Sequence, residues 1–277
     1  MKKKPLDEDS SDDEFLKRSV RLGSIDGRKE LLKPRVFSSI ADDSARDIAI
    51  SCSDLIVANN LECLTTYLAT LPRHLQIHRI IDDEGYTLLH MAAFQDRTKI
   101  FKLLISKAKA ELRPEELLIW INNKTQEDQF NALHYAAWKG NIHIMKILIE
   151  NGAEKYSKNA YGLNCLHIAA QSDQAISLYY FKQLGMNIYS RSNDGLTPLH
   201  WACHSNSEIA MIYLLAWYDT TALNMKDKEG STPLLLTIKS ADELGSGRPM
   251  RAMLMAGADK EVLDKKKKNA KWYASKL

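Results

Sequence analysis

The sequence has few cysteines, no large excess of charge of one sign and no long apolar run, and each absence excludes a class of protein. Its 277 residues include four cysteines without a CxxC spacing: Cys52, Cys63, Cys165 and Cys203. This pattern argues against a disulfide framework and a zinc knuckle. The net charge of +3 is too small for the whole surface to bind a polyanion. No apolar run approaches the about 20 residues that cross a bilayer, and the start, MKKKPLDEDS, lacks a secretory signal. We therefore expect a soluble protein with reduced thiols, in the cytosol or the nucleus.

Motifs of common catalytic sites are also missing. The sequence contains no G-x-S-x-G, no H-E-x-x-H and no glycine-rich phosphate loop. Cys203 and His204 are adjacent, and neighbours at i and i+1 on a helix do not face each other. We expect no enzyme activity, no cofactor and no metal, although a dyad that the fold assembles from distant residues stays open.

Residues 1–45 differ in composition from the rest of the chain. Six acids lie within Asp7–Glu14, and a mainly basic stretch follows within Lys17–Arg35. Because such a segment buries too little apolar surface to offset its ordering entropy, we predict a disordered charged arm. Ser10 and Ser11 each precede an acid by three residues, so they are candidate sites for a casein-kinase-type enzyme. The alternative is that the acids only keep the arm solvated.

The remainder of the chain repeats itself. Four segments share a Leu-His step and a fifth has Leu in place of His: TLLHMAA (Thr87–Ala93), NALHYAA (Asn131–Ala137), NCLHIAA (Asn164–Ala170), TPLHWAC (Thr197–Cys203) and TPLLLTI (Thr232–Ile238). Equivalent positions in successive segments are 44, 33, 33 and 35 residues apart. This spacing and residue pattern resemble the ankyrin repeat, with its 33-residue period and T-P-L-H core. One such unit cannot cover its own apolar face, so neighbouring units must stack. We predict an all-α ankyrin-repeat solenoid with β-hairpin-like turns over residues 46–277.

The solenoid has special segments at its ends and two irregular segments inside. Asp54–Leu68 resembles a leading helix pair that breaks at its Asn-Asn step, and Leu263–Ala274 begins a unit without a second helix. Lys265–Lys268 would solubilise that exposed end, or serve as a nuclear-import or lipid-binding element. The 44-residue spacing contains an insertion, Lys107–Asn123, in which RPEE predicts the start of an extra helix. This inserted segment would lie either over the concave groove of the stack or on its convex side. Ala241–Pro249 contains two Gly and one Pro, so we predict a loop there.

The regularly spaced histidines invite a metal hypothesis, which geometry opposes. Equivalent positions in stacked helices lie about 10 Å apart, whereas zinc ligands each approach the ion to about 2 Å. The resemblance to ankyrin proteins implies that each imidazole binds loop backbone between adjacent repeats. We expect His90, His134, His167 and His200 to be structural.

Positions that the repeat pattern leaves free are the candidates for partner binding. In ankyrin domains, turn tips and the ends of the first helices line a concave surface that contacts partners. Aromatic residues are common here in the first three units, and aromatic side chains at exposed positions are typical of binding hot spots. The candidates are Tyr86, Phe94, Gln95, Phe130, Tyr135, Trp138, Tyr161 and Leu163. The alternative is that several pack against neighbouring repeats. A protein or an extended peptide is the expected partner, and nucleic acid is not, because no basic stripe recurs from repeat to repeat.

The sequence of the repeats also resembles the cytosolic ankyrin arm of DHHC palmitoyltransferases of the huntingtin-interacting type. The similarity covers about residues 80–260 and is carried by TLLHMAAFQDR with LLISKAKA, GLNCLHIAAQ and GLTPLHWAC. It implies that the arm recruits substrates by holding an extended peptide between its first two units. The family's recruiting Asn and Trp correspond to Gln95 and Tyr135, which keep an amide and an aromatic ring. The family's membrane helices and Asp-His-His-Cys site are absent from this chain.

Three functions follow from these observations. We expect a non-catalytic protein-binding module, located in the cytoplasm or at the cytosolic face of a membrane through a partner. The alternative is the recruiting part of a palmitoyltransferase. A third function, masking a transcription factor, would need an acidic concave face, and Lys139 and Lys228 argue against one.

Overall fold

The computed structural model describes residues 45–72, 75–244 and 247–276. The predicted disordered arm lies outside these residues except for Ala45, and the phosphorylation candidates Ser10 and Ser11 lie outside them too. The regular elements of the described residues are helices. In chain order they are α2 (Ala45–Val57), α3 (Leu61–Thr70), η3 (Ile77–Arg79), α4 (Leu88–Phe94), α5 (Thr98–Glu111), α6 (Pro114–Ile121), α7 (Ala132–Lys139), α8 (Ile142–Glu150), α9 (Cys165–Gln171), α10 (Ala175–Gln183), α11 (Pro198–His204), α12 (Glu208–Leu215), α13 (Thr220–Leu223), α14 (Pro233–Leu244), α15 (Arg248–Met255) and α16 (Ala270–Ala274).

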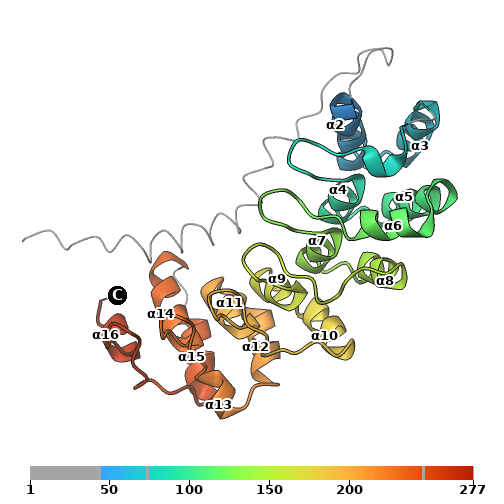
Figure 1. Ribbon diagram of the computed structural model, residues 1–277. Coiled ribbons are helices and arrows are strands. Elements are labelled where there is room, and N and C mark those ends of the chain that lie inside the picture. The colour runs from blue at the N-terminus through green and yellow to red at the C-terminus, as the bar shows by residue number, and fades with distance from the viewer. Residues whose placement is uncertain (1–44, 73–74, 245–246, 277) are drawn as a thin grey trace, which may run out of the picture. The chain divides into compact units, whose positions relative to one another are not determined.

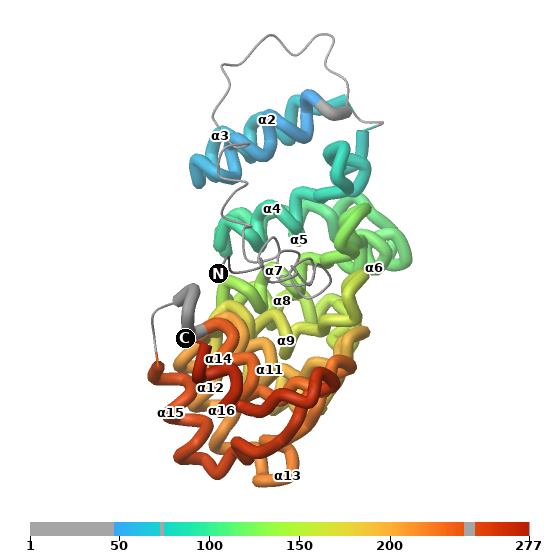
Figure 2. The backbone as a smooth tube through the Cα atoms, turned by 90° about the vertical axis from the view of Figure 1, so that its left-hand side faces the viewer, coloured from blue at the N-terminus to red at the C-terminus, as the bar shows by residue number. Residues whose placement is uncertain are grey.

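The helices form pairs that stack in chain order (Figure 1). The first helices of successive repeats, α4, α7, α9, α11 and α14, each pack on the next, and the second helices, α5, α8, α10, α12 and α15, form an adjacent row. The colours of Figure 2 follow the same order, so neighbours in sequence are neighbours in space. This arrangement confirms the prediction of an all-α ankyrin-repeat stack.

Small side chains let the first helices approach closely. Pairs of alanines recur on successive first helices, Ala92–Ala93, Ala136–Ala137 and Ala169–Ala170, and all are fully buried. The second helices supply larger core residues, among them Phe101 and Phe181. Each repeat therefore completes its core only with side chains from its neighbours.

The turns that open successive repeats are joined edge to edge. Within the first turn the backbone N–H of Asp82 donates to the carbonyl of Tyr86, and an isolated β-bridge joins Ile81 and Thr87. One backbone hydrogen bond then connects each turn with the next: Gln126 to Glu84, Ala160 to Asp128, Asn193 to Tyr161, Lys228 to Asp194 and Lys265 to Glu229. These bonds of 2.8–3.0 Å confirm the predicted hairpin-like turns and make them one continuous edge.

The four repeat histidines fasten each helix to the turn that follows the repeat. Each Nδ1 accepts a hydrogen bond from the backbone N–H of the helix N-cap residue: Thr87, Asn131, Asn164 and Thr197. Because Nδ1 accepts, the proton is on Nε2. That N–H donates to backbone carbonyls farther along the chain, those of Asn123, Ser157, Ser190 with Leu196, and Ser231. The predicted structural role of the histidines is confirmed.

The described residues at the two ends of the stack and in the insertion contain helices. The leading helices α2 and α3 are separated at Ala58–Asn60, where Asn59 has a φ of 55° and Asn60 caps α3. The insertion forms α6 directly after Arg113, and α6 packs against α5 and η3, beside the second helices. After Leu263 the described residues contain one helix, α16.

The predicted loop Ala241–Pro249 is wrong in its extent. Helix α14 continues to Leu244 and α15 begins at Arg248, so helical backbone occupies most of the segment. The reason is local, since Ala241, Asp242, Glu243 and Leu244 precede the glycines and none of them interrupts a helix.

A candidate protein-binding surface

An aromatic cluster joins the first two repeats. Tyr135 on α7 is at its centre, with ring centroids 5.9 Å from Tyr86, 5.8 Å from Phe94 and 5.5 Å from Phe130. The Tyr135 hydroxyl donates to the Tyr86 hydroxyl at 3.1 Å. His90 meets the rings of Tyr86 and Tyr135 edge-on. The junction between α4 and α7 is therefore filled by aromatic rings that pack against one another.

Three of the candidate residues are buried, so the alternative that several pack against neighbouring repeats holds for them. Phe130 is 3% exposed, Leu163 is fully buried and Tyr135 is 4% exposed. Phe130 and Leu163 directly precede the N-caps of α7 and α9, where the side chain points into the stack rather than toward a partner. Tyr135 sits one turn into α7 and faces α4 of the preceding repeat. These three residues therefore pack beneath the accessible candidate residues.

The other aromatic candidates keep part of their surface accessible. Tyr86, Phe94, Trp138 and Tyr161 are half-buried, and we call these four side chains the aromatic face. Phe94 and Trp138 occupy equivalent positions at the ends of α4 and α7. The half-buried Gln95 caps α4 beside them.

Charged groups adjoin the aromatic face. The ammonium nitrogen of Lys139 lies 4.8 Å from the centroid of the Phe94 ring, and the Tyr161 hydroxyl donates to Asp128 at 2.8 Å. Exposed acids at the tips of the first two turns include Glu84 and Glu127. The later turn tips carry more basic residues, such as Lys228 and Lys265. The acids on these two turns were missed by the sequence reasoning, and a comparison of charge at equivalent turn positions would have found them.

Burial shifts the pKa values of several thiols and of His204 in the directions that favour their neutral forms. Burial raises the pKa of the Cys203 thiol and lowers the pKa of His204 to about 4, so this neighbouring pair holds a neutral thiol and a neutral imidazole. Burial also raises the pKa of Cys52 to about 12. Among residues 45–72, 75–244 and 247–276, no group of three or more His, Cys, Asp or Glu is placed to hold a metal ion.

Comparison with known proteins identifies the repeat. A family model of three ankyrin copies matches residues 115–181 and 166–264, and one of many ankyrin copies matches residues 52–105. The chain belongs to the ankyrin-repeat family. It is also 33% identical over 85 residues to the palmitoyltransferase AKR1 of Lachancea kluyveri, a match that covers 31% of this chain and 10% of that enzyme. The helices in the described part of the chain include none that is long and apolar enough to span a membrane.

Proposed function

We propose that this ankyrin chain is a non-catalytic protein-binding module that holds an extended segment of its partner against the aromatic face. The observation that carries the proposal is the group of half-buried rings, Tyr86, Phe94, Trp138 and Tyr161, on three successive repeats. Half-buried aromatic side chains supply large contact areas, and their rotamers are already restricted by packing, so they lose little entropy on binding. The proposed partner residues are apolar side chains that cover these rings, while Gln95 bonds the peptide backbone.

Charge beside the aromatic face favours one kind of segment. Glu84 and Glu127 are exposed on the first two turns, and Glu84 lies two residues before Tyr86 of the aromatic face. An extended segment that alternates apolar and basic residues would complement both the rings and the acids. Three cysteines are buried and one, Cys63, is exposed, all as free thiols, so we propose that the module works in a reducing compartment.

A peptide array tests this proposal with the full chain. We expect bound peptides to be enriched in apolar and basic residues, and Phe94→Ala combined with Trp138→Ala to weaken binding about tenfold or more. The affinity for a bound peptide should also fall between 50 and 300 mM salt, as measured by fluorescence anisotropy.

Ile209→Gln is the matched control because it removes an exposed apolar side chain from α12, in the row of second helices. Unchanged peptide binding in the Phe94→Ala, Trp138→Ala variant, with its circular dichroism intact, would remove the aromatic face as the binding surface.

A second candidate is the substrate-recruiting arm of an acyltransferase. It is favoured by the 33% identity with part of a protein named palmitoyltransferase AKR1. In this candidate the same face selects the proteins to be acylated, and the chemistry belongs to a membrane catalytic segment. Sequencing the gene beyond the codon of Leu277 tests it: an in-frame segment with membrane helices and an Asp-His-His-Cys motif supports it, and a stop codon contradicts the single-chain form.

A further inference from the structure

The row of second helices carries an exposed apolar cluster away from the aromatic face. On α10 and α12 four large side chains are more than half exposed: Ile176 (58%) and Tyr179 (51%) on α10, and Ile209 (63%) and Ile212 (60%) on α12. On both helices they stand two and five residues after the N-cap, Gln174 or Ser207, and the two helices contact each other. The four side chains therefore form one patch rather than scattered exposed residues.

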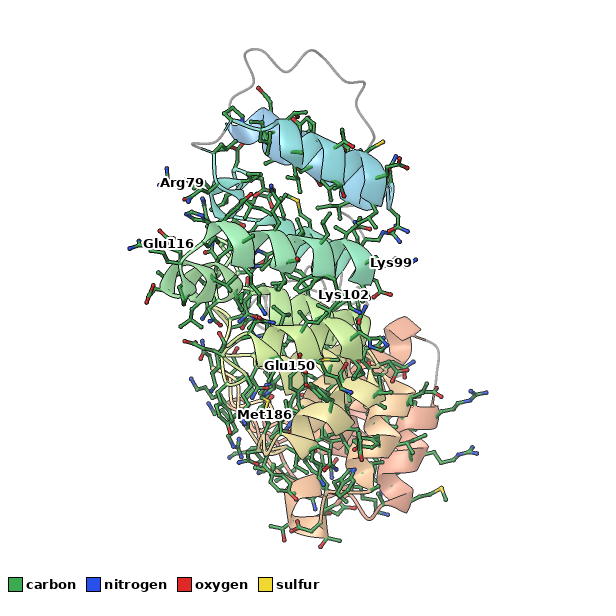
Figure 3. The ribbon with its side chains drawn as sticks, turned by 90° about the vertical axis from the view of Figure 1, so that its right-hand side faces the viewer. Arg79, Lys99, Lys102, Glu116, Glu150 and Met186 are labelled. Atoms are coloured by element: carbon green, nitrogen blue, oxygen red, sulfur yellow. The ribbon has the colours of Figure 1, made fainter. Side chains whose placement is uncertain are left out.

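Basic residues take the same positions on the helices to either side. On α5 the places two and five residues after the N-cap Arg97 are Lys99 and Lys102, and on α8 the corresponding places after Asn141 are His143 and Lys146. All four are exposed. Figure 3 looks onto this row and shows Lys99 and Lys102 on α5 and Glu150 on α8.

Helix α15 continues the pattern on the far side of the patch. Two residues after the last residue of α10 and of α15 comes a left-handed glycine, Gly185 or Gly257. Counted back from these glycines, Arg248 and Arg251 match Ile176 and Tyr179, and both arginines are exposed. Arg248 also lies 3.7 Å from Glu208.

These ten places define what we call the outer ridge: two on each of five successive second helices. They carry four apolar side chains in the middle, Lys or Arg at five of the flanking places, and His143 at the sixth. None is acidic, although Glu150 lies one turn farther along α8. The ridge is therefore an apolar centre with cationic flanks.

We propose that the outer ridge binds an anionic lipid surface. More than half of the surface of each of its four apolar side chains is exposed. A lipid surface can bury such side chains without a shaped pocket. Lys and Arg on both flanks would face the lipid phosphates. A second copy of this chain fits less well, because a two-fold arrangement of ridge on ridge places the lysine flank of one copy against the arginine flank of the other. This inference is independent of the proposed peptide binding.

Co-sedimentation of the full chain with vesicles tests the proposal. We expect binding to vesicles of phosphatidylcholine with about 30% phosphatidylserine and little binding to phosphatidylcholine alone. Ile209→Gln with Ile212→Gln should lower the partition coefficient about tenfold, and Lys99→Gln, Lys102→Gln and Lys146→Gln together should lower it by tenfold or more.

The matched control removes the same charge elsewhere. Lys265→Gln, Lys266→Gln and Lys267→Gln lie on the final turn, which the sequence offers as the competing lipid-binding element, and they should leave binding within about twofold if the ridge is the site. Equal losses from the two lysine triples would overturn the ridge as the binding site. If the folded wild-type chain does not bind anionic vesicles, lipid is not the ligand of the ridge. A protein partner would then be the remaining candidate.

A labelled variant keeps the test decisive if a multiple substitution impairs folding. Ile212→Cys, placed in a Cys63→Ser background and labelled with an environment-sensitive dye, should shift its emission to the blue on anionic vesicles. Unchanged emission at lipid concentrations that sediment the protein would contradict the proposal.

Discussion

Four histidines show how single residues hold this stack together. Each imidazole accepts from the N-cap of its own helix and donates to a carbonyl that lies 23 to 33 residues farther along. Because burial disfavours the charged ring, it lowers the pKa of His90 and His167 to about 4 and of His134 and His200 to about 3. A protonated ring would also lose the acceptor at Nδ1.

Acid should therefore destabilise the protein well before its carboxylates titrate. Between about pH 6.5 and pH 4 the unfolded chain takes up protons on these histidines and the folded chain does not, so stability is full above this window and falls as the pH falls. We expect a loss of about 1 kcal/mol for each histidine between pH 7.5 and 5.5, measured by urea unfolding. His143→Gln, on the exposed surface of α8, should leave this loss unchanged. Equal stability at the two pH values would contradict the role given to the buried rings.

At the scale of elements, the joined turns make each repeat depend on its neighbour. Gly162 has a φ of 74°, and a Cβ added there would lie 2.6 Å from the backbone nitrogen of Asn193 in the next turn. Gly185 has a similar φ of 81°, but a Cβ there would meet no atom within 4 Å. The two glycines share a backbone requirement and differ in whether another turn lies against them.

This pair separates backbone strain from turn packing. We expect Gly185→Ala to cost about 1 kcal/mol, because a left-handed conformation is unfavourable for alanine. Gly162→Ala should cost about 2 kcal/mol or more, because it also pushes the next turn away and strains the bond from Asn193 to Tyr161. Thermal unfolding of both variants measures the difference, and equal melting temperatures would show that the joined turns add little stability.

Across the described stack, a central helix packs against more neighbouring helices than α16 does. Helix α9 packs against α7, α10 and α11, whereas α16 packs mainly against α14. In a linear array, stability depends on contacts between nearest neighbours, so the ends open more easily than the middle.

Hydrogen exchange should show this gradient. We expect the slowest amide exchange in the central first helices, such as Ala169 and Ala170 of α9, and the fastest among the helices in α16. Mass spectrometry of peptides from the exchanged chain measures the gradient. Uniform protection from the first repeat to the last would mean that the stack opens as a single unit instead.

Much of the fold follows from local sequence. The repeat spacing predicts the order of the helix pairs and RPEE predicts the start of α6, whereas the histidine bonds are implied by the resemblance to ankyrin proteins. The candidate surface was predicted less completely. Its half-buried rings Phe94 and Trp138 were named, but Phe130 and Leu163 proved buried, because a repeat period does not tell on which side of the neighbouring turn a side chain lies.

The repeating unit can be predicted from the amino-acid sequence, because each unit is built from short-range patterns of apolar spacing, caps and turn residues. Which side chains stay accessible depends on how the repeats stack. Stacking buries Tyr135 among three other rings, and it brings Ile176 and Tyr179 beside Ile209 and Ile212, which lie 33 residues farther along. The physical reason is that exposure depends on contacts between repeats, and these contacts exist only after the units have stacked.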